Sequence, residues 1–192
     1  MLGTSALLAH TNLTPDQEEL LRTITVSSQQ LSSLISNVLD LSRIEENKLV
    51  VEKSPVSLEK CFTESCELFR SDAIRLKLEI IMEIDISVPV WVASDELRIR
   101  QVITNLLSNA IKFATPHSTV SLTATKTTIN DKEYILVSVE DEGRGISQQA
   151  GRTLFESYNQ LDSSTTKQYG GSGLGLVISK VSTNSIHIQI FM

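Results

Sequence analysis

Residues 95–114 read Asp95-Glu-Leu-Arg-Ile-Arg-Gln-Val-Ile-Thr-Asn-Leu-Leu-Ser-Asn-Ala-Ile-Lys-Phe-Ala114 and carry the clearest helical pattern in the chain. Apolar side chains recur at steps of three and four residues, the spacing that places them on one side of an α-helix. They are Ile99, Val102, Ile103, Leu106, Leu107, Ala110 and Phe113. The pattern predicts a helix that packs this side against a hydrophobic core.

The opposite side of this helix is polar and carries Arg98, Gln101, Asn105, Asn109 and Lys112. Asparagine is unfavourable inside a helix because its amide competes for backbone hydrogen bonds. Two asparagines one turn apart, with a lysine on the next turn, therefore favour a surface kept for a ligand. Amide oxygens suit a hard cation such as Mg²⁺, and an ammonium group suits phosphate oxygens. Taken alone, the stripe is explained equally well by a solvated helix face.

Two glycine-containing motifs follow in the sequence: Asp141-Glu-Gly-Arg-Gly-Ile146 and Gly170-Gly-Ser-Gly-Leu-Gly-Leu176. The first comes after a predicted strand, and the second opens a predicted helix. A helix with asparagines and a lysine, then Asp-x-Gly-x-Gly, then a glycine-rich turn is an ordered three-part pattern. It resembles the ATP-binding domain of histidine protein kinases, within the wider family of gyrase B, Hsp90 and MutL.

The resemblance implies a role for each matching residue. Asn109 would hold Mg²⁺, Asn105 would assist with metal or phosphate, and Lys112 would neutralise phosphate charge. Asp141 would bind adenine, Gly143 and Gly145 would begin a lid over the nucleotide, and Phe155 would pack at its base. The residues that would shape the phosphate cradle are Gly171, Gly173, Leu174 and Gly175. Backbone N–H groups at a glycine-rich helix start suit phosphate, whereas a flexible linker is the plainer interpretation.

Asp141 also stands out without the resemblance. Ile135, Val137, Val139 and Asp141 alternate along the predicted strand 134–141, so they share one face. A carboxylate that ends an apolar row is costly to bury unless it meets a hydrogen-bond donor. Adenine binding would supply that donor, and a simple turn before Gly143 is the alternative.

The segment from Thr14 to about Asn47 is predicted to form one long helix. Thr14-Pro-Asp-Gln17 is a well-formed helix start, with a cap, an N1 proline and a capping box. A coiled-coil seam follows: Leu20, Ile24, Ser27, Leu31, Leu34, Val38 and Leu41. Such a helix needs partner helices, although an ordinary core-facing helix is also possible. The segment resembles the second helix of the dimerisation and phosphoacceptor domain of hybrid-type histidine kinases.

That family carries its phosphorylated histidine in a His-Glu-x-Arg-Thr-Pro box on the preceding helix. The three histidines of this chain, His10, His117 and His187, do not lie in such a box. Beyond Lys180, a Gly-Gly turn and two closing strands of the family are not found. Ile186, Ile188 and Ile190 alternate as one substitute strand would. We therefore expect truncation at both ends.

The remaining segments alternate between strands and helices. We predict a strand at 48–55, a helix from Leu58 to about Arg70 after the cap Ser57, and a strand at 76–84. Phe62, Leu68 and Phe69 are the inward candidates of that helix. A short extended piece at 90–92 leads to the central helix, with Trp91 as a packing residue. A hairpin follows, with strands near 120–124 and 134–141 and a turn at 127–131.

Bulk properties narrow the function classes. With 192 residues and 41% hydrophobic content, the chain can bury one sizeable core and a small accessory element. Its net charge of −6 argues against a general nucleic-acid-binding surface. No run reaches the roughly 18 apolar residues of a transmembrane helix. Two cysteines, Cys61 and Cys66, are too few for a disulfide framework, so we expect a cytoplasmic protein whose membrane-anchored sensor region, if any, lies outside this chain.

These observations predict an α+β fold, a two-layer sandwich of the histidine kinase, gyrase and Hsp90 type preceded by a long bundle helix. We expect a partial dimerisation region at 1–47 and an ATP-binding kinase domain at 48–192. The expected function is ATP- and Mg²⁺-dependent phosphoryl transfer to a histidine supplied outside this chain. Its partners would be a second kinase chain, through helix 14–47, and a response regulator or receiver domain. The alternative is a non-catalytic interaction module, and a gyrase- or Hsp90-like ATPase is weaker because Asn105 stands where those enzymes need a hydrolytic base.

Overall fold

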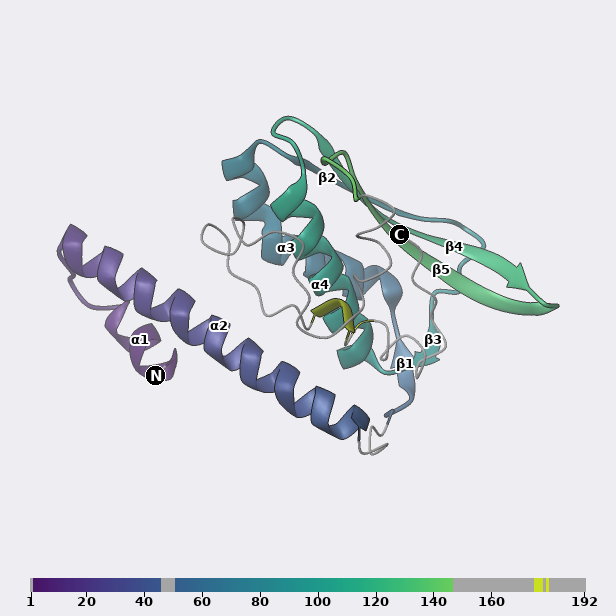
Figure 1. Cartoon of the computed structure of the whole chain (residues 1–192), viewed down its shortest axis with the longest axis horizontal. Coiled ribbons are helices and arrows are strands. Elements are labelled where there is room, and N and C mark those ends of the chain that lie inside the picture. Colours follow the sequence, from purple (N-terminus) through teal and green to yellow (C-terminus); the bar gives the residue numbers. More distant parts are fainter. Residues whose placement is uncertain (1, 46–50, 147–174, 178, 180–192) are drawn as a thin grey trace. The chain divides into compact units, whose positions relative to one another are not determined.

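The computed structural model describes residues 2–45, 51–146, 175–177 and 179 of the 192-residue chain. The chain divides into two compact units, Met1–Leu49 and Val50–Met192. Figure 1 labels their helices and strands. Within the described part of the chain, no helix combines the length and the apolar character that a membrane crossing requires.

The first unit consists of helix α1 (Leu2–Leu8) packed beside the long helix α2 (Pro15–Glu45). The predicted capping box is present at the start of α2. The Gln17 backbone N–H donates to Thr14 Oγ1 at 3.4 Å, and the Thr14 N–H donates to Gln17 Oε1 at 3.0 Å. Two backbone donors that the helix cannot satisfy are thereby paired.

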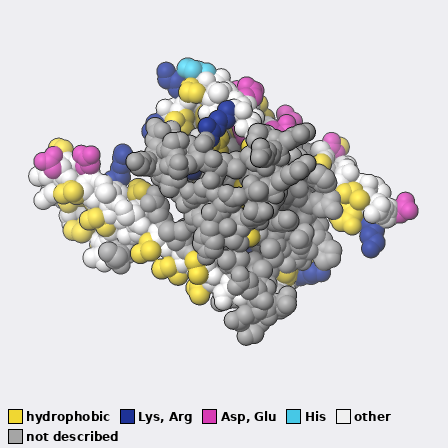
Figure 2. Space-filling view, viewed as in Figure 1, with side chains coloured by type: hydrophobic (Ala, Val, Ile, Leu, Met, Phe, Trp, Pro, Cys, Tyr) yellow, Lys and Arg dark blue, Asp and Glu magenta, His cyan; other side chains and the backbone are white. Residues whose placement is uncertain are grey.

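The predicted seam of α2 lies at the surface of this unit. Its described apolar members Leu20, Ile24, Leu31 and Val38 are all exposed. Figure 2 shows hydrophobic side chains gathered along α2. The side chains of Leu34 and Leu41 lie outside the described residues. An exposed apolar row at this spacing is suited to packing against another helix.

The second unit has two helices packed on a mixed sheet. Its elements are β1 (Ser54–Val56), α3 (Leu58–Leu76), β2 (Glu79–Ile84), β3 (Val92–Ser94), α4 (Glu96–Phe113), β4 (Thr119–Ile129) and β5 (Lys132–Asp141). The main sheet has the order β2-β4-β5, in which β2 and β4 are parallel and β4 and β5 antiparallel. Strands β1 and β3 form a separate antiparallel pair. Helices α3 and α4 lie on one face of the main sheet (Figure 1), which confirms the predicted α+β sandwich.

The core lies between the helices and the sheet. Its largest fully buried side chains are Phe62 of α3, Ile99, Ile103 and Leu107 of α4, and Leu122 of β4. Val137 of β5 is buried, and Ile135 and Val139 pack against the core from the same strand. The apolar stripe of α4 and the alternation of β5 are thus confirmed, except that Phe113 is 37% exposed.

Helix α3 differs from its prediction at its end and on its buried face. It begins after the Ser57 cap as predicted but continues to Leu76 instead of Arg70, and Lys77 then closes it in the left-handed conformation at φ 57°. Strand β2 consequently starts at Glu79. Leu68, predicted to point inward, is 67% exposed. The inward stripe of α3 runs through the buried Leu58, Phe62 and Ser65 and the partly buried Phe69, and it excludes Leu68.

Two further predictions on the strands need correction. The strand predicted at 48–55 is the three-residue β1, which contains Pro55 and pairs with β3; residues 48–50 lie outside the described residues. The hairpin is longer than predicted, because a two-residue turn at Asn130 and Asp131 joins its strands, with φ values of 50° and 61°. Asparagine and aspartate tolerate this left-handed backbone.

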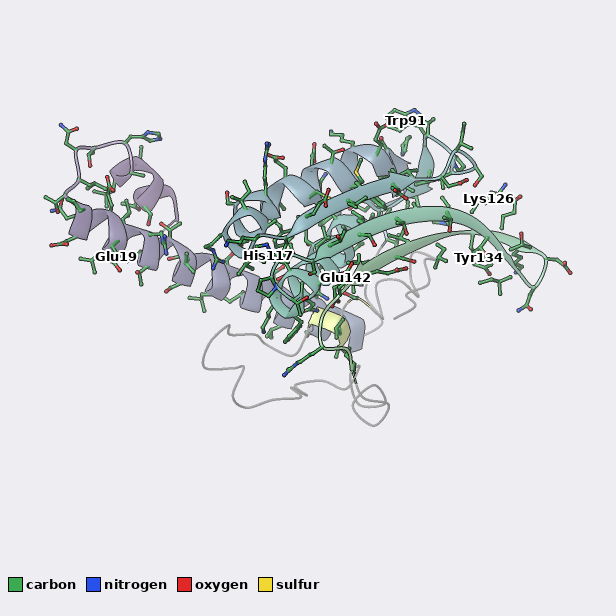
Figure 3. All side chains as sticks on the ribbon, turned by 90° about the horizontal axis from the view of Figure 1, so that it is seen from above. Glu19, Trp91, His117, Lys126, Tyr134 and Glu142 are labelled. Atoms are coloured by element: carbon green, nitrogen blue, oxygen red, sulfur yellow. The ribbon has the colours of Figure 1, made fainter. Side chains whose placement is uncertain are left out.

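Trp91 was predicted to pack but is 64% exposed. It precedes β3 and is labelled in Figure 3. Strand β3 begins at Val92, where the backbone pairs with Val56, so the extended piece predicted at 90–92 is shifted by two residues. Nothing in the described residues explains why tryptophan stands at this position.

Helix α4 offers a matched test of the core. Replacing the fully buried Leu107 with alanine removes methyl groups from a packed site and should lower the free energy of unfolding by about 2–5 kcal/mol. The same change at Leu97, which is 68% exposed on the same helix, should cost less than about 1 kcal/mol. Urea unfolding followed by the fluorescence of Trp91, the single tryptophan, measures both. Equal costs would contradict the assigned faces of α4.

Candidate functional site

Helix α4 carries Asn105, Asn109 and Lys112, the residues predicted to serve phosphate and metal. A side-chain cap fixes the start of this helix. Asp95 adopts an extended conformation, and its Oδ1 accepts the backbone N–H of Arg98 at 3.1 Å. With the apolar side buried, Asn105, Asn109 and Lys112 lie half-buried on successive turns of the other side. The helix therefore fixes the relative positions of two amides and one ammonium group.

The polar stripe begins with a side-chain pair near the helix start. Arg98 is only 8% exposed, and its Nη1 donates to Gln101 Oε1 at 2.9 Å. This bond joins the first two residues of the predicted stripe along the axis of α4. A buried arginine needs such a hydrogen-bond partner, so we interpret Arg98 as a structural residue of the helix.

Asn105 meets the chain segment that follows the glycine-rich motif. Its Nδ2 donates to Ser179 Oγ at 2.9 Å, across 74 positions of sequence. A Cβ atom added to Gly175 would overlap with the Asn105 amide oxygen, so a larger residue here would displace the Asn105 side chain. Val177 and Ser179 are buried beside it, in the short described helical piece. Gly175, the last residue of the predicted phosphate cradle, thus lies against the middle of α4.

The remaining predicted cradle and lid residues cannot be placed. Gly171, Gly173, Leu174 and Phe155 lie outside the described residues. Their proposed roles stay predictions. The same holds for the alternating isoleucines near the end of the sequence.

The loop after β5 is fastened to the C-terminal end of α4. Asp141 Oδ1 accepts the Gly143 backbone N–H at 2.8 Å. Gly143 forms an isolated antiparallel bridge with Ala114, and a Cβ on it would come within 2.5 Å of both the Phe113 carbonyl oxygen and Asp141 Oδ1. Gly145 has φ +68°, a conformation that favours glycine. Both glycines of this motif are therefore required by the backbone.

A side-chain hydrogen bond strengthens the same junction. Thr115 Oγ1 donates to the Glu142 carbonyl oxygen at 2.9 Å. Residues 113–115, at the C-terminal end of α4, and residues 141–143, at the end of β5, are therefore joined by a bridge, a close glycine contact and a hydrogen bond. The exposed Asp141 carboxylate is held near the end of α4 that carries Lys112.

Phe113 gathers two cations at this end of the helix, which the sequence analysis did not foresee. Lys112 Nζ lies 5.1 Å from the centre of the Phe113 ring, and Arg144 Cζ lies 5.7 Å from it. Cations within about 6 Å of a ring centre are attracted to its face. The Phe113 ring was predicted to lie in the core, but it contacts Lys112 and Arg144 next to the loop that follows Asp141. No spacing rule in the sequence relates positions 113 and 144.

Burial shifts the titration of Lys112. Loss of hydration lowers the pKa of its ammonium group below the usual 10.5. A partly desolvated ammonium gains free energy when an anion takes the place of the lost water. Together with the half-buried Asn109 and the glycine contacts, this makes the polar side of α4 chemically suited to a phosphate group with a hard cation.

Comparisons with known proteins agree with this chemistry. The family model described as histidine kinase-, DNA gyrase B- and HSP90-like ATPase matches residues 94–191. The model of the His Kinase A (phospho-acceptor) domain matches residues 1–47.

Similar proteins span the whole chain. It is 38% identical over 180 residues to the sensor protein GacS of Pseudomonas syringae pv. syringae, covering 94% of this chain and 20% of GacS. It is 36% identical over 186 residues to the signal transduction histidine-protein kinase BarA of Escherichia coli K12, covering 97% of this chain and 20% of BarA. The chain thus spans about one fifth of the length of these relatives.

A solved structure has a similar fold. The crystal structure of full-length ShkA in complex with AMPPNP superposes with a TM-score of 0.72 at 30% identity. The match covers 96% of this chain and 37% of the ShkA chain.

Proposed function

Because this chain belongs to the histidine kinase-, DNA gyrase B- and HSP90-like ATPase family, we propose that it binds Mg-ATP on the polar side of α4. We further propose that it serves as the kinase module of a two-component system and delivers the γ-phosphoryl group to a histidine outside this chain. The observation that carries the proposal is the contact of Asn105 with Gly175 and Ser179. It joins the asparagine helix to the glycine-rich segment, as a phosphate site requires. ShkA, which was crystallised with AMPPNP, supports the choice of nucleotide.

Three side chains of α4 would serve the phosphates and the metal. Asn109 would supply an amide oxygen to Mg²⁺, which commonly takes few protein ligands and several phosphate oxygens. Lys112, whose burial lowers its pKa, would neutralise phosphate charge. Asn105 would hold the backbone at Gly175 close to the phosphates. A side chain at Gly175 would displace the Asn105 amide, so glycine lets backbone and amide lie together at the proposed site.

Asp141 would recognise the adenine base through a hydrogen bond. One carboxylate oxygen, Oδ1, already accepts the Gly143 N–H at 2.8 Å, which fixes the orientation of the group. The other oxygen can then accept a hydrogen bond from the exocyclic amine of adenine. Guanine presents a carbonyl oxygen at that position, and two acceptors facing each other repel. The geometry therefore favours ATP over GTP.

The protein's share of the phosphoryl transfer would be positioning and charge neutralisation. Bound ATP supplies the transferable phosphoryl group, and Mg²⁺ offsets its charge. Lys112 and the backbone N–H groups of the glycine segment would hold the phosphates in line with an incoming nucleophile. His10, His117 and His187 do not lie in the phosphoacceptor motif, so the nucleophile would come from outside this chain.

Replacing Asp141 with asparagine tests the nucleotide site. The substitution keeps the size of the side chain but turns one acceptor into a donor that faces the adenine amine. We expect the affinity for Mg-ATP to fall by about tenfold or more, because a hydrogen bond to a charged group is worth about 1.5–3 kcal/mol. The preference for ATP over GTP should shrink at the same time. Isothermal titration calorimetry with both nucleotides measures the two effects.

Glu140→Gln is the matched control, because it makes the same chemical change one residue earlier in β5. Alternation puts Glu140 on the other face of the strand from Asp141, and its side chain is exposed. Its affinity for Mg-ATP should stay within about twofold of the wild type. Equal losses in the two variants, or no binding by the wild-type chain, would refute the assignment of this site.

The second candidate function is a non-catalytic interaction module, favoured by the exposed seam of α2. The two functions differ in a trans-phosphorylation assay. If the chain is a kinase module, mixing it with Mg-ATP and a histidine kinase that lacks its own ATP-binding domain should produce acid-labile phosphohistidine. The Asp141→Asn variant should give about tenfold less at limiting ATP. Nucleotide binding without any phosphohistidine would favour the interaction module.

The exposed seam of α2 also supports a homodimer, or pairing with a related kinase chain. Ile24 and Val26 give a matched pair, since both are β-branched and similarly exposed, at 48% and 44%. Two positions along a helix are about 200° apart, so Val26 faces away from the seam. Ile24→Lys should weaken self-association by about tenfold or more, whereas Val26→Lys should leave it nearly unchanged. Sedimentation velocity over a concentration series measures this, and equal effects would place the contact elsewhere.

A further inference from the structure

The first described residues after α2 are fastened to the start of α4. The chain leaves α2 at Glu45, and after residues 46–50 it reaches the segment 51–53 and then β1. Strand β1 pairs in antiparallel register with β3, which ends one residue before Asp95. The Ser54 hydroxyl adds a long hydrogen bond to the Ser94 carbonyl oxygen at 3.5 Å. The first described residues of the second unit therefore lie next to the N-terminus of the site helix.

Asp95 joins the two segments with a single carboxylate. Its Oδ1 accepts the backbone N–H of Arg98, in the first turn of α4, at 3.1 Å. Its Oδ2 accepts the backbone N–H of Glu52 at 3.2 Å, across 43 positions of sequence. The side chain is only 7% exposed, so both bonds are largely shielded from water. An ordinary N-cap uses one oxygen for the helix and leaves the other to solvent.

We propose that Asp95 is a positioning residue that couples the connecting segment 51–53 to α4. A displacement of the connecting segment would then be passed through the carboxylate to the helix that carries Asn105, Asn109 and Lys112. This inference rests on the proposed function, because nucleotide bound to α4 is one of the two states that it couples. Coupling between two sites acts in both directions. Occupation of the nucleotide site must therefore alter the connecting segment.

The coupling can be cut without removing the helix cap. Asparagine is as good an N-cap as aspartate, so Asp95→Asn can keep the bond to Arg98 through its amide oxygen. Its NH₂ group then faces the Glu52 N–H, and two donors replace a donor and an acceptor. Ser57→Ala is the control, because Ser57 caps α3 in the same unit by accepting the Lys60 N–H at 3.3 Å. That substitution removes a cap without touching the connecting segment.

The hydrogen bond between Asp95 and the Glu52 N–H can also be removed by a substitution at Glu52. Glu52→Pro removes the N–H that Asp95 accepts, since proline has no backbone donor. Glu52→Ala keeps the N–H and removes only the side chain. This pair leaves Asp95 and the cap of α4 intact. It keeps the inference testable if Asp95→Asn does not fold.

Amide hydrogen exchange of the full chain, with and without Mg-ATP, is the decisive measurement. In the wild type and in Ser57→Ala, saturating Mg-ATP should slow exchange in segment 51–53 by about fivefold or more, the lower end of ordinary coupling between sites. In Asp95→Asn this slowing should disappear, while the affinity for Mg-ATP stays within about threefold of the wild type. A purely structural cap would not produce a nucleotide-dependent difference at a segment far along the chain.

A second arm needs no nucleotide. Glu52→Pro should speed exchange of the α4 amides at 105–112 by about fivefold relative to Glu52→Ala. Equal exchange in these two variants, or equal slowing by Mg-ATP in wild type and Asp95→Asn, overturns the inference. Absence of Mg-ATP binding by the wild type refutes the proposed function instead. The nucleotide-free arm then still decides whether Asp95 couples the two segments.

Discussion

The two-sided character of α4 is the constraint on which the rest of the second unit depends. Its apolar side, including Ile99, Ile103 and Leu107, is fully buried against α3 and the sheet. Burial of that many large side chains fixes the rotation of the helix about its own axis, because turning it would expose them to water. The polar side is thereby committed to one direction. Asn105, on that side, contacts Gly175 and Ser179, and Asn109 and Lys112 follow it on the next turns.

Glycine at two places lets neighbouring backbone come close to that helix. At Gly175 and at Gly143 the neighbouring chain comes so close to α4 or to its C-terminal end that a Cβ would collide with Asn105 or with the Phe113 carbonyl. The approach at Gly175 places backbone beside Asn105 of the polar stripe, and the approach at Gly143 places backbone beside the Phe113 carbonyl. A phosphate group is well served by such a surface, since backbone N–H groups donate without carrying charge. This is compatible with a chain whose net charge is −6 and whose basic groups at the site are few.

Much of the framework could be predicted because its causes are local. Ser57 caps its helix, the Thr14 box forms, and the stripe of α4 is buried, all within a few residues of the signal. The errors have non-local causes. Leu68 and Trp91 are apolar but exposed. Helix α3 continues to Leu76 because Lys77, in the left-handed conformation, ends it, and lysine is not a residue type from which a helix end is predicted. In the site, the residue types were predictable but the Asn105–Ser179 and Phe113–Arg144 contacts were not, since only the fold brings them together.

Helix α4 is held at several points along its length, and this explains why its position matters. The Asp95 carboxylate fastens its start, Arg100 bridges it to Glu64 of α3 while also pairing with Glu96 at 2.6 Å, and Ser179 holds Asn105 in the middle. The Ala114–Gly143 bridge fixes its end. A helix moves as a rigid body, so a displacement of one end also displaces the other. Misplacement of a catalytic group by about 1 Å can lower the rate about a hundredfold. Under the proposed function, a small change at the connecting segment would therefore suffice to alter how Asn109 and Lys112 contact the nucleotide.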